Sequence, residues 1–143
     1  EKLKEQIIAG IRWRCVDIID LNIVPTSLLN FHNHVNDNDA SVMITASHNP
    51  LNWNGFKINI GAKSLSGKQL KELCAICHDQ EIEQDRCYSS YQVISYTKQY
   101  IDKILEVSCK NRTASFDQYL PKIIWNINFG AASTIIPLLT SYL

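Results

Sequence analysis

The sequence predicts an α/β protein: a mixed, mostly parallel sheet with helices on both faces, followed by the start of a second, similar α/β unit. Two observations lead to this prediction. Segments with helical periodicity alternate with short apolar runs typical of strands. The composition is that of a folded protein, because the 143 residues are 45% hydrophobic and 20% charged. Alternation of helices and strands favours parallel sheets that helices cover on both sides.

The first helices and strands follow from periodicity and from residues that break it. Apolar residues at helical spacing predict a helix over residues 3–11, and the apolar run 16–21 predicts a short strand. The V-P-T break at residues 24–26 ends that strand and introduces a second helix. The β-rich run 41–45 lies between two polar stretches, and we therefore expect it to be a buried strand.

A hairpin signal and a helix come next. Residues 56–60 alternate apolar and polar side chains after the turn pair Asn54-Gly55, which predicts a half-exposed strand. Helical spacing then returns over residues 66–80, where Ser66 and Gln69 have the spacing of a capping box.

The chain is expected to divide into two domains. Neither period holds over residues 84–95, where we place a hinge between a first domain (1–93) and the beginning of a second (94–143). The second part is expected to contain a helix around residues 100–105, an apolar strand at 123–127 and a final helix after Gly130. A start without Met and an end inside an apolar run suggest a piece of a longer polypeptide.

Charge and hydropathy exclude several classes of partner. Fourteen basic residues balance fourteen acidic ones, so no bulk positive field is available to hold nucleic acid or an anionic bilayer. No apolar run approaches the roughly 20 residues of a membrane-spanning helix. Five cysteines in irregular spacing argue against a disulfide framework and favour a reducing, cytoplasmic location.

Residues 74–78 read C-A-I-C-H, a pattern found in haem attachment and, with Cys87, a candidate zinc site. We favour a structural interpretation, because Cys74 and Cys77 fall on the apolar stripe of the expected helix, where free cysteines pack as small apolar side chains. His32 and His34 lie in a run rich in turn residues and are expected to be exposed to solvent.

The segment most informative about chemistry is residues 45–50, T-A-S-H-N-P, followed by N-G-F-K at 54–57. It places the Ser47 hydroxyl after a strand, where ligands bind in open α/β sheets. His48 can move a proton near neutral pH, and Lys57 offers a charge suited to phosphate. These residue types suggest a nucleophile or phosphoryl carrier. The plain structural alternative is a polar loop in which Ser47 and Asn49 bond to the backbone.

The amino-acid sequence of this segment resembles the active-site loop of the α-D-phosphohexomutases, the family of phosphoglucomutases and phosphomannomutases. The V-P-T run at 24–26 resembles a further family loop, with Ser27 where a second Pro is usual, and residues 128–132 resemble the segment that opens the second domain. Thr45 and the N-G-F-K-I run resemble the phosphomannomutase/phosphoglucomutase branch more than the phosphoglucosamine branch.

The resemblance implies roles for individual residues. Ser47 would carry the transferable phosphoryl group as phosphoserine, and one of its phosphate oxygens would ligate Mg²⁺. His48 would assist proton transfer to or from the sugar hydroxyl. Lys57 would stabilise charge on the phosphoryl group, and Asn49 together with Lys57 would contact the substrate. The implied reaction interconverts hexose 1-phosphate and hexose 6-phosphate, of glucose or mannose, through a bisphosphate intermediate.

The resemblance covers the front part of a four-domain enzyme, and the family's other metal and phosphate loops are not found in the sequence. Ser47 is the single expected magnesium ligand, so we expect the isolated chain to be inactive. A non-catalytic binding or phosphocarrier remnant of the same family is the second hypothesis. A haem or zinc protein built on Cys74, Cys77 and His78 is the third.

Overall fold

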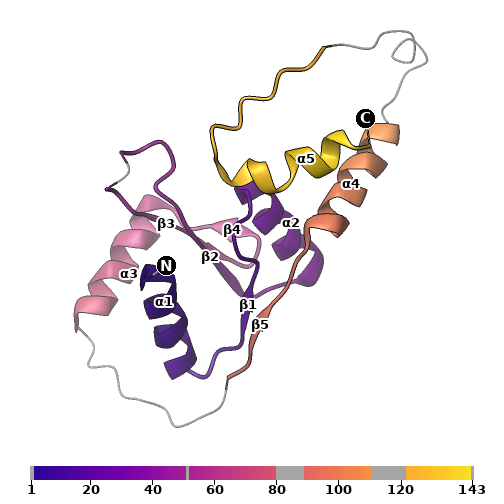
Figure 1. Cartoon of the computed structure of the whole chain (residues 1–143). Helices are drawn as coiled ribbons and strands as arrows, with labels where there is room; N and C mark the ends of the chain where they lie inside the picture. Colours follow the sequence, from indigo (N-terminus) through magenta and orange to yellow (C-terminus); the bar gives the residue numbers. More distant parts are fainter. Residues whose placement is uncertain (1, 51, 80–88, 111–121, 143) are drawn as a thin grey trace.

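The structure is a computed structural model that describes residues 2–50, 52–79, 89–110 and 122–142 (Figure 1). Helices and strands alternate along most of the chain, as the periodicity predicts. In chain order they are α1 (Lys2–Trp13), β1 (Ile18–Asp20), α2 (Thr26–Asn36), β2 (Ala40–Ile44), β3 (Phe56–Ile60), β4 (Lys63–Ser64), α3 (Gly67–Asp79), β5 (Tyr91–Val93), α4 (Thr97–Lys110), the 3₁₀ helix η2 (Ala131–Thr134) and α5 (Ile136–Thr140).

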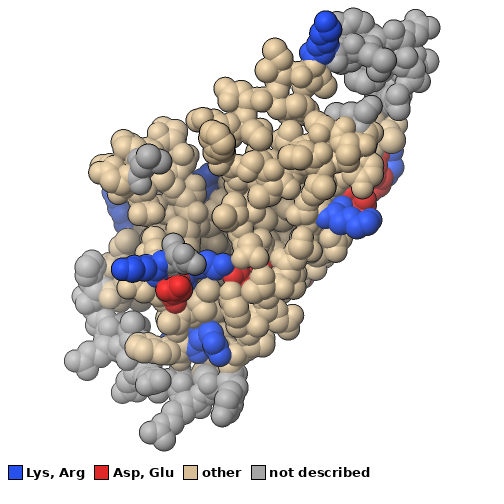
Figure 2. Space-filling view, in the orientation of Figure 1, with Lys and Arg blue, Asp and Glu red and all other residues tan. Residues whose placement is uncertain are grey.

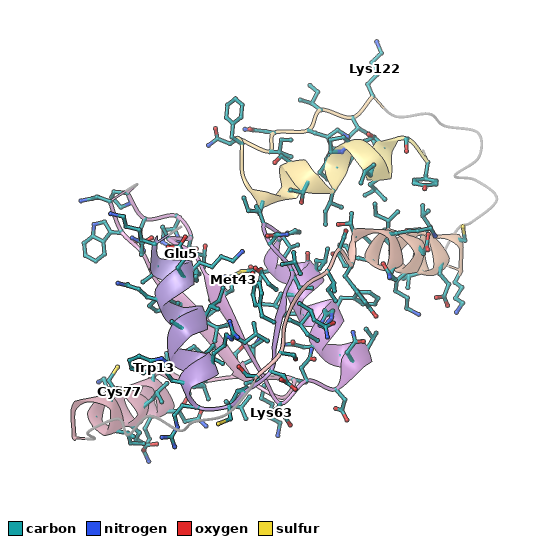
Figure 3. All side chains as sticks on the ribbon, turned by 60° about the horizontal axis from the view of Figure 1, so that its bottom comes forward. Glu5, Trp13, Met43, Lys63, Cys77 and Lys122 are labelled. Atoms are coloured by element: carbon teal, nitrogen blue, oxygen red, sulfur yellow. The ribbon has the colours of Figure 1, made fainter. Side chains whose placement is uncertain are left out.

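The mixed α/β class is confirmed, and the described strands form two sheets. β1 and β5 pair in parallel, and β2, β3 and β4 form an antiparallel sheet in that order. In Figures 1 and 3 the strands lie between α1 and α3 on one side and α2 on the other. More of the strand pairing is antiparallel than the sequence predicted. The reason is that a loop, and not a crossover helix, joins β2 to β3.

Asp20, at the end of β1, ties three elements together. Its carboxylate accepts a 2.5 Å hydrogen bond from the Tyr91 hydroxyl on β5 and forms a 2.5 Å ion pair with Lys4 on α1. Burial opposes ionisation of Asp20, but the hydrogen bonds from Lys4, Tyr91 and the Asn22 backbone outweigh it and lower the pKa of this carboxyl. These contacts fix α1 against the parallel pair.

Local signals place the helix ends close to the expected positions. The predicted capping box is confirmed, since the Gln69 side chain accepts a 2.9 Å hydrogen bond from the Ser66 N–H and the Gln69 N–H reaches the Ser66 hydroxyl at 3.4 Å. Helix α2 begins after Pro25 and ends at Asp37, which adopts the left-handed conformation with φ 52°.

The hydrophobic core lies where α2, α4 and the η2–α5 segment meet. Leu28, Ile101 and Ile135 are buried there at 0%, 3% and 4% exposure. Leu28 comes from the predicted first domain and the other two from the predicted second. The boundary between residues 93 and 94 stays a prediction, and the segments on its two sides share this core.

Several expectations on strands were wrong or incomplete. Residues 123–127 do not form a strand; this stretch is extended in Figure 1, and Ile124 is 94% exposed. A strand needs a neighbour to bond its backbone, and none of the described strands lies beside this stretch. By contrast, β5 forms inside the predicted hinge because β1 supplies its partner. β2 is a strand but is not buried, since Val42 and Ile44 are 38% and 36% exposed.

Burial of single side chains also differs from expectation. Cys74 and Cys77 are exposed free thiols, because α3 turns both toward solvent instead of packing its cysteines into a core. His32 is buried, at 3% exposure, where its ring meets Tyr96 edge-on at 4.6 Å. Cys15 is disulfide-bonded, which its spacing from the other cysteines did not predict. The alternative zinc or haem arrangement of the C-A-I-C-H run includes His78, whose side chain lies outside the described set, and Cys87, which lies outside the described residues.

Charges are sparse on the face seen in Figure 2, where they lie mainly over α1 and along α4. There Lys98 pairs with Asp102 at 2.6 Å, and Glu106 pairs with Lys103 and Lys110. The hydrogen bonds from these two lysines lower the pKa of Glu106 to about 2. In the part of the chain that the structure describes, no helix is both long and apolar enough to cross a membrane.

Candidate active-site loop

The candidate site is the loop of residues 45–55 that joins β2 to β3. The Thr45 N–H donates a 2.9 Å hydrogen bond to the Gly55 carbonyl, which closes the base of the loop. A Cβ on Gly55 would lie 3.1 Å from the Thr45 carbonyl oxygen, so a side chain here would crowd that base. Two tight turns follow inside, with Asn49 N–H bonded to the Ala46 carbonyl at 3.0 Å and Trp53 N–H to the Pro50 carbonyl at 2.9 Å. The described residues of the loop, 45–50 and 52–55, therefore have a defined backbone shape.

Ser47 is the second residue of the first turn, which runs from Ala46 to Asn49, and is exposed. Its backbone is left-handed, with φ 55°, a conformation that costs energy for a residue with a Cβ. The Ser47 N–H donates a 3.0 Å hydrogen bond to the Thr45 hydroxyl, which orients the peptide group that leads into Ser47. Thr45 is thus a supporting residue that the sequence analysis missed, although a Thr two residues before a Ser is a recognisable local turn signal.

His48 lies beside the serine. The distance between Ser47 Oγ and His48 Nδ1 is 3.3 Å, and both side chains are exposed. A hydroxyl and an imidazole at this distance can exchange a proton directly or through a small movement. The structure therefore brings together the two residues for which proton and phosphoryl chemistry was expected.

Lys57 and Asn49 are positioned separately. Lys57 lies on β3, directly opposite Met43 of β2, and is exposed. Asn49 is exposed in the loop, one residue after His48. No hydrogen bond joins either side chain to Ser47 within the described residues. Their expected contacts with substrate stay predictions.

The start of α2 is linked to this region. The Thr26 hydroxyl, in the V-P-T run, donates a 3.1 Å hydrogen bond to the Met43 sulfur near the end of β2. Two segments that resemble family loops in the sequence are thus connected in the fold, close to the loop that carries Ser47.

The described residues offer few side chains that could hold Mg²⁺. Across residues 2–50, 52–79, 89–110 and 122–142, no three His, Cys, Asp or Glu side chains converge on a common point. Mg²⁺ prefers octahedral oxygen ligands and keeps several waters. Ser47 offers one exposed oxygen, so these residues fit a single ligand and do not by themselves complete a metal site.

Comparison with known families decides the relationship. The family model described as "Phosphoglucomutase/phosphomannomutase, alpha/beta/alpha domain I" matches residues 1–84, which include the whole loop and both strands that carry it. The chain belongs to the phosphoglucomutase/phosphomannomutase family. The resemblance seen in the loop sequence is therefore confirmed.

The relatives of this family member are named as mutases of different sugar phosphates. The chain is 26% identical over 138 residues to a phosphomannomutase of Vibrio cholerae, covering 95% of this chain and 29% of that one. It is 29% identical over 141 residues to a phosphomannomutase of Salmonella typhimurium, with 95% and 30% covered. A probable phosphoglucosamine mutase of Pyrococcus abyssi is 47% identical over 58 residues, 41% of this chain and 13% of that one.

A solved structure shows the same relationship. A phosphoglucomutase/phosphomannomutase family protein from Burkholderia thailandensis superposes with a TM-score of 0.63 at 26% identity, over 73% of this chain and 24% of that one. The family member described here spans less than a third of the length of the phosphomannomutases that it matches.

Proposed function

We propose that this chain is the amino-terminal part of a phosphohexomutase that interconverts hexose 1-phosphate and hexose 6-phosphate, with Ser47 as the phosphoryl carrier. The observation that carries the proposal is the conformation of Ser47. This serine is exposed and has a left-handed backbone, its N–H is bonded to the Thr45 hydroxyl, and its Oγ lies 3.3 Å from His48 Nδ1. Backbone strain at an exposed nucleophile is typical of functional sites.

The proposed reaction has two phosphoryl transfers. Phosphoserine 47 gives its phosphoryl group to a hydroxyl of the hexose phosphate, forming a bisphosphate; the P–O bond to Ser47 Oγ breaks as the P–O bond to the sugar forms. His48 takes the proton that the sugar hydroxyl loses. That proton then passes from His48 to the departing Ser47 Oγ. In the return transfer the Ser47 hydroxyl attacks the other phosphoryl group of the bisphosphate: the P–O bond to the sugar breaks as the bond to Oγ forms, and the proton of the hydroxyl passes to the sugar oxygen, which leaves the isomeric sugar phosphate.

Lys57 and Asn49 have electrostatic and binding roles in this proposal. Phosphoryl transfer asks a protein mainly for positioning and for stabilisation of negative charge. The exposed Lys57 ammonium would supply positive charge, and Asn49 would bind the sugar phosphate. Mg²⁺, ligated by an oxygen of phosphorylated Ser47, would supply further positive charge when bound. Glucose and mannose phosphates are the expected substrates, because phosphomannomutases and a phosphomannomutase/phosphoglucomutase are among the relatives.

A chimera tests the proposal most directly. Residues 1–143 would replace the matching segment of the Vibrio cholerae phosphomannomutase, and hexose phosphate interconversion would be measured with and without Ser47→Ala. We expect turnover that Ser47→Ala abolishes. A folded chimera that lacks turnover would support the non-catalytic remnant instead. A chimera that Ser47→Ala leaves active would refute Ser47 as the phosphoryl carrier.

Phosphate mapping gives a second test on the 143-residue chain. After incubation with a hexose bisphosphate and Mg²⁺, intact mass and peptide mapping should place one phosphoryl group on Ser47. Ser66→Ala is a matched control, because this exposed serine caps a helix and should not affect loading. The isolated chain should not turn over hexose phosphates, since it spans less than a third of its relatives.

A further inference from the structure

A buried polar network lies between α2 and the antiparallel sheet. Asn33 on α2 and Asn59 on β3 are only 5% and 6% exposed. Both donate to the Ser41 hydroxyl on β2, Asn33 at 2.5 Å and Asn59 at 3.0 Å. The Ser64 hydroxyl on β4 donates to Asn59 Oδ1 at 2.6 Å. Asn59 thus connects all three strands of the sheet to the helix.

The network specifies which face of the sheet meets α2. Ser41, Met43, Lys57 and Asn59 share this face, because side chains alternate along a strand and these residues are paired across β2 and β3. The opposite face is apolar and includes Val42 and Ile44 on β2 and Phe56, Ile58 and Ile60 on β3. A shift of one residue would place that apolar face against α2 and leave the buried amide groups without partners.

Lys57 and the serine loop depend on the same register. On β3, Lys57 precedes Asn59 by two residues and therefore lies on the same face. The Thr45–Gly55 hydrogen bond continues the pairing of β2 with β3 into the base of the loop. Asn59 therefore fixes the same face and register of the β2–β3 pair on which Lys57 depends. The same register closes the base of the loop that carries Ser47.

We propose that Asn59 is a positioning residue for the candidate active site: its three-strand hydrogen-bond network holds the β2–β3 register that presents Lys57 and forms the loop of Ser47. The inference rests on the proposed function for its chemical importance. The positioning itself is a physical property that can be measured without catalysis.

Amide hydrogen exchange of the 143-residue chain tests the positioning. The quantity to measure is the exchange rate of the Thr45 amide divided by that of the Ile101 amide, which lies in the core helix α4 and reports unfolding of the core. In Asn59→Leu we expect this ratio to rise about tenfold, because the base of the loop opens while the core stays closed. The control is Leu28→Ala, which weakens the core without touching the network and should not raise the ratio.

Two further variants keep the test decisive. Ser64→Ala removes one bond to Asn59 and should raise the ratio less, which covers the case in which Asn59→Leu fails to fold. The double variant Ser41→Asn, Asn59→Ser exchanges the two side chains and so keeps one amide and one hydroxyl across the pair. It should return the exchange ratio to that of the parent chain. An unchanged ratio in Ser64→Ala and Asn59→Leu, or an equal rise in Leu28→Ala, would overturn the inference.

Phosphoryl loading of Ser47 separates this inference from the proposed function. If the exchange ratio responds as expected and the chimera with the Vibrio cholerae phosphomannomutase takes no phosphoryl group on Ser47, Asn59 positions the loop but the carrier proposal fails. If Ser47 is loaded equally in the parent chimera and in a folded chimera with Asn59→Leu, the carrier proposal stands and the positioning role is overturned.

Discussion

Replacing Ser47 by glycine should make the chain more stable while removing the group proposed to do the chemistry. Ser47 has φ 55°, in the left-handed region where a Cβ costs roughly 1–2 kcal/mol. Glycine avoids that cost but gains freedom in the unfolded chain, which offsets about 0.5–1 kcal/mol. Because Ser47→Ala keeps the Cβ and also lacks the hydroxyl, it is the correct reference. We expect Ser47→Gly to exceed Ser47→Ala in free energy of unfolding by about 0.5–1 kcal/mol.

Urea unfolding followed by far-ultraviolet circular dichroism measures this difference, provided that the two variants share one slope. Ser133 supplies a matched control, because it is exposed in η2 and does not have positive φ. There the order should reverse, with Ser133→Ala more stable than Ser133→Gly by about 0.5–1 kcal/mol. If Ser47→Ala equals or exceeds Ser47→Gly in stability, the serine is not held in the left-handed conformation and the strain argument fails.

Two other predictions concern the core and its neighbouring histidine. Leu28→Ala should lower the free energy of unfolding by about 2–5 kcal/mol, because Leu28 is fully buried against Ile101 and Ile135; a loss below about 1 kcal/mol in urea unfolding would show that this core is not formed. Burial lowers the pKa of His32 below its ordinary value of 6.5, so the unfolded chain binds this proton more readily than the folded chain. Stability should therefore fall as the pH drops below 6.5 and continue to fall until the lower folded pKa is passed. Urea midpoints across this range should lose that slope in His32→Gln and keep it in the exposed-site control His34→Gln; equal slopes in both variants would contradict the assignment.

The sequence predicted those parts of the site whose structure depends on residues close together in the chain. The T-A-S-H-N-P run and the Asn54-Gly55 pair indicated a shaped loop between two strands, and the structure has β2 and β3 on either side of it. Pro50 fixes its own φ through its ring, Gly55 has no Cβ to crowd the Thr45 carbonyl, and Ser47 and His48 are adjacent in the chain. Neighbouring residues need no distant partner to meet, so their proximity can be inferred without the fold.

The errors occurred where a distant segment decides the outcome. Residues 123–127 have the apolar pattern of a strand but lack a strand beside them among the described residues. Tyr91–Val93 are too few to show a clear period, and they form β5 because β1 pairs with them. His32 has polar neighbours in sequence and is nevertheless buried beneath Tyr96, which lies 64 positions later in the chain. Hydropathy along the chain cannot report which remote segment will cover a residue.

The sequence by itself therefore determined the order of most helices, the capping of α3, the loop of Ser47 and the family. The tertiary structure alone decided that β2 and β3 pair in an antiparallel register, that Asn59 joins three strands to α2, and that the core combines Leu28 with Ile101 and Ile135. The physical reason is the range of the interactions. Backbone preferences and caps act within about one helical turn, whereas strand pairing, burial and buried hydrogen bonds need partners that only the folded chain brings together.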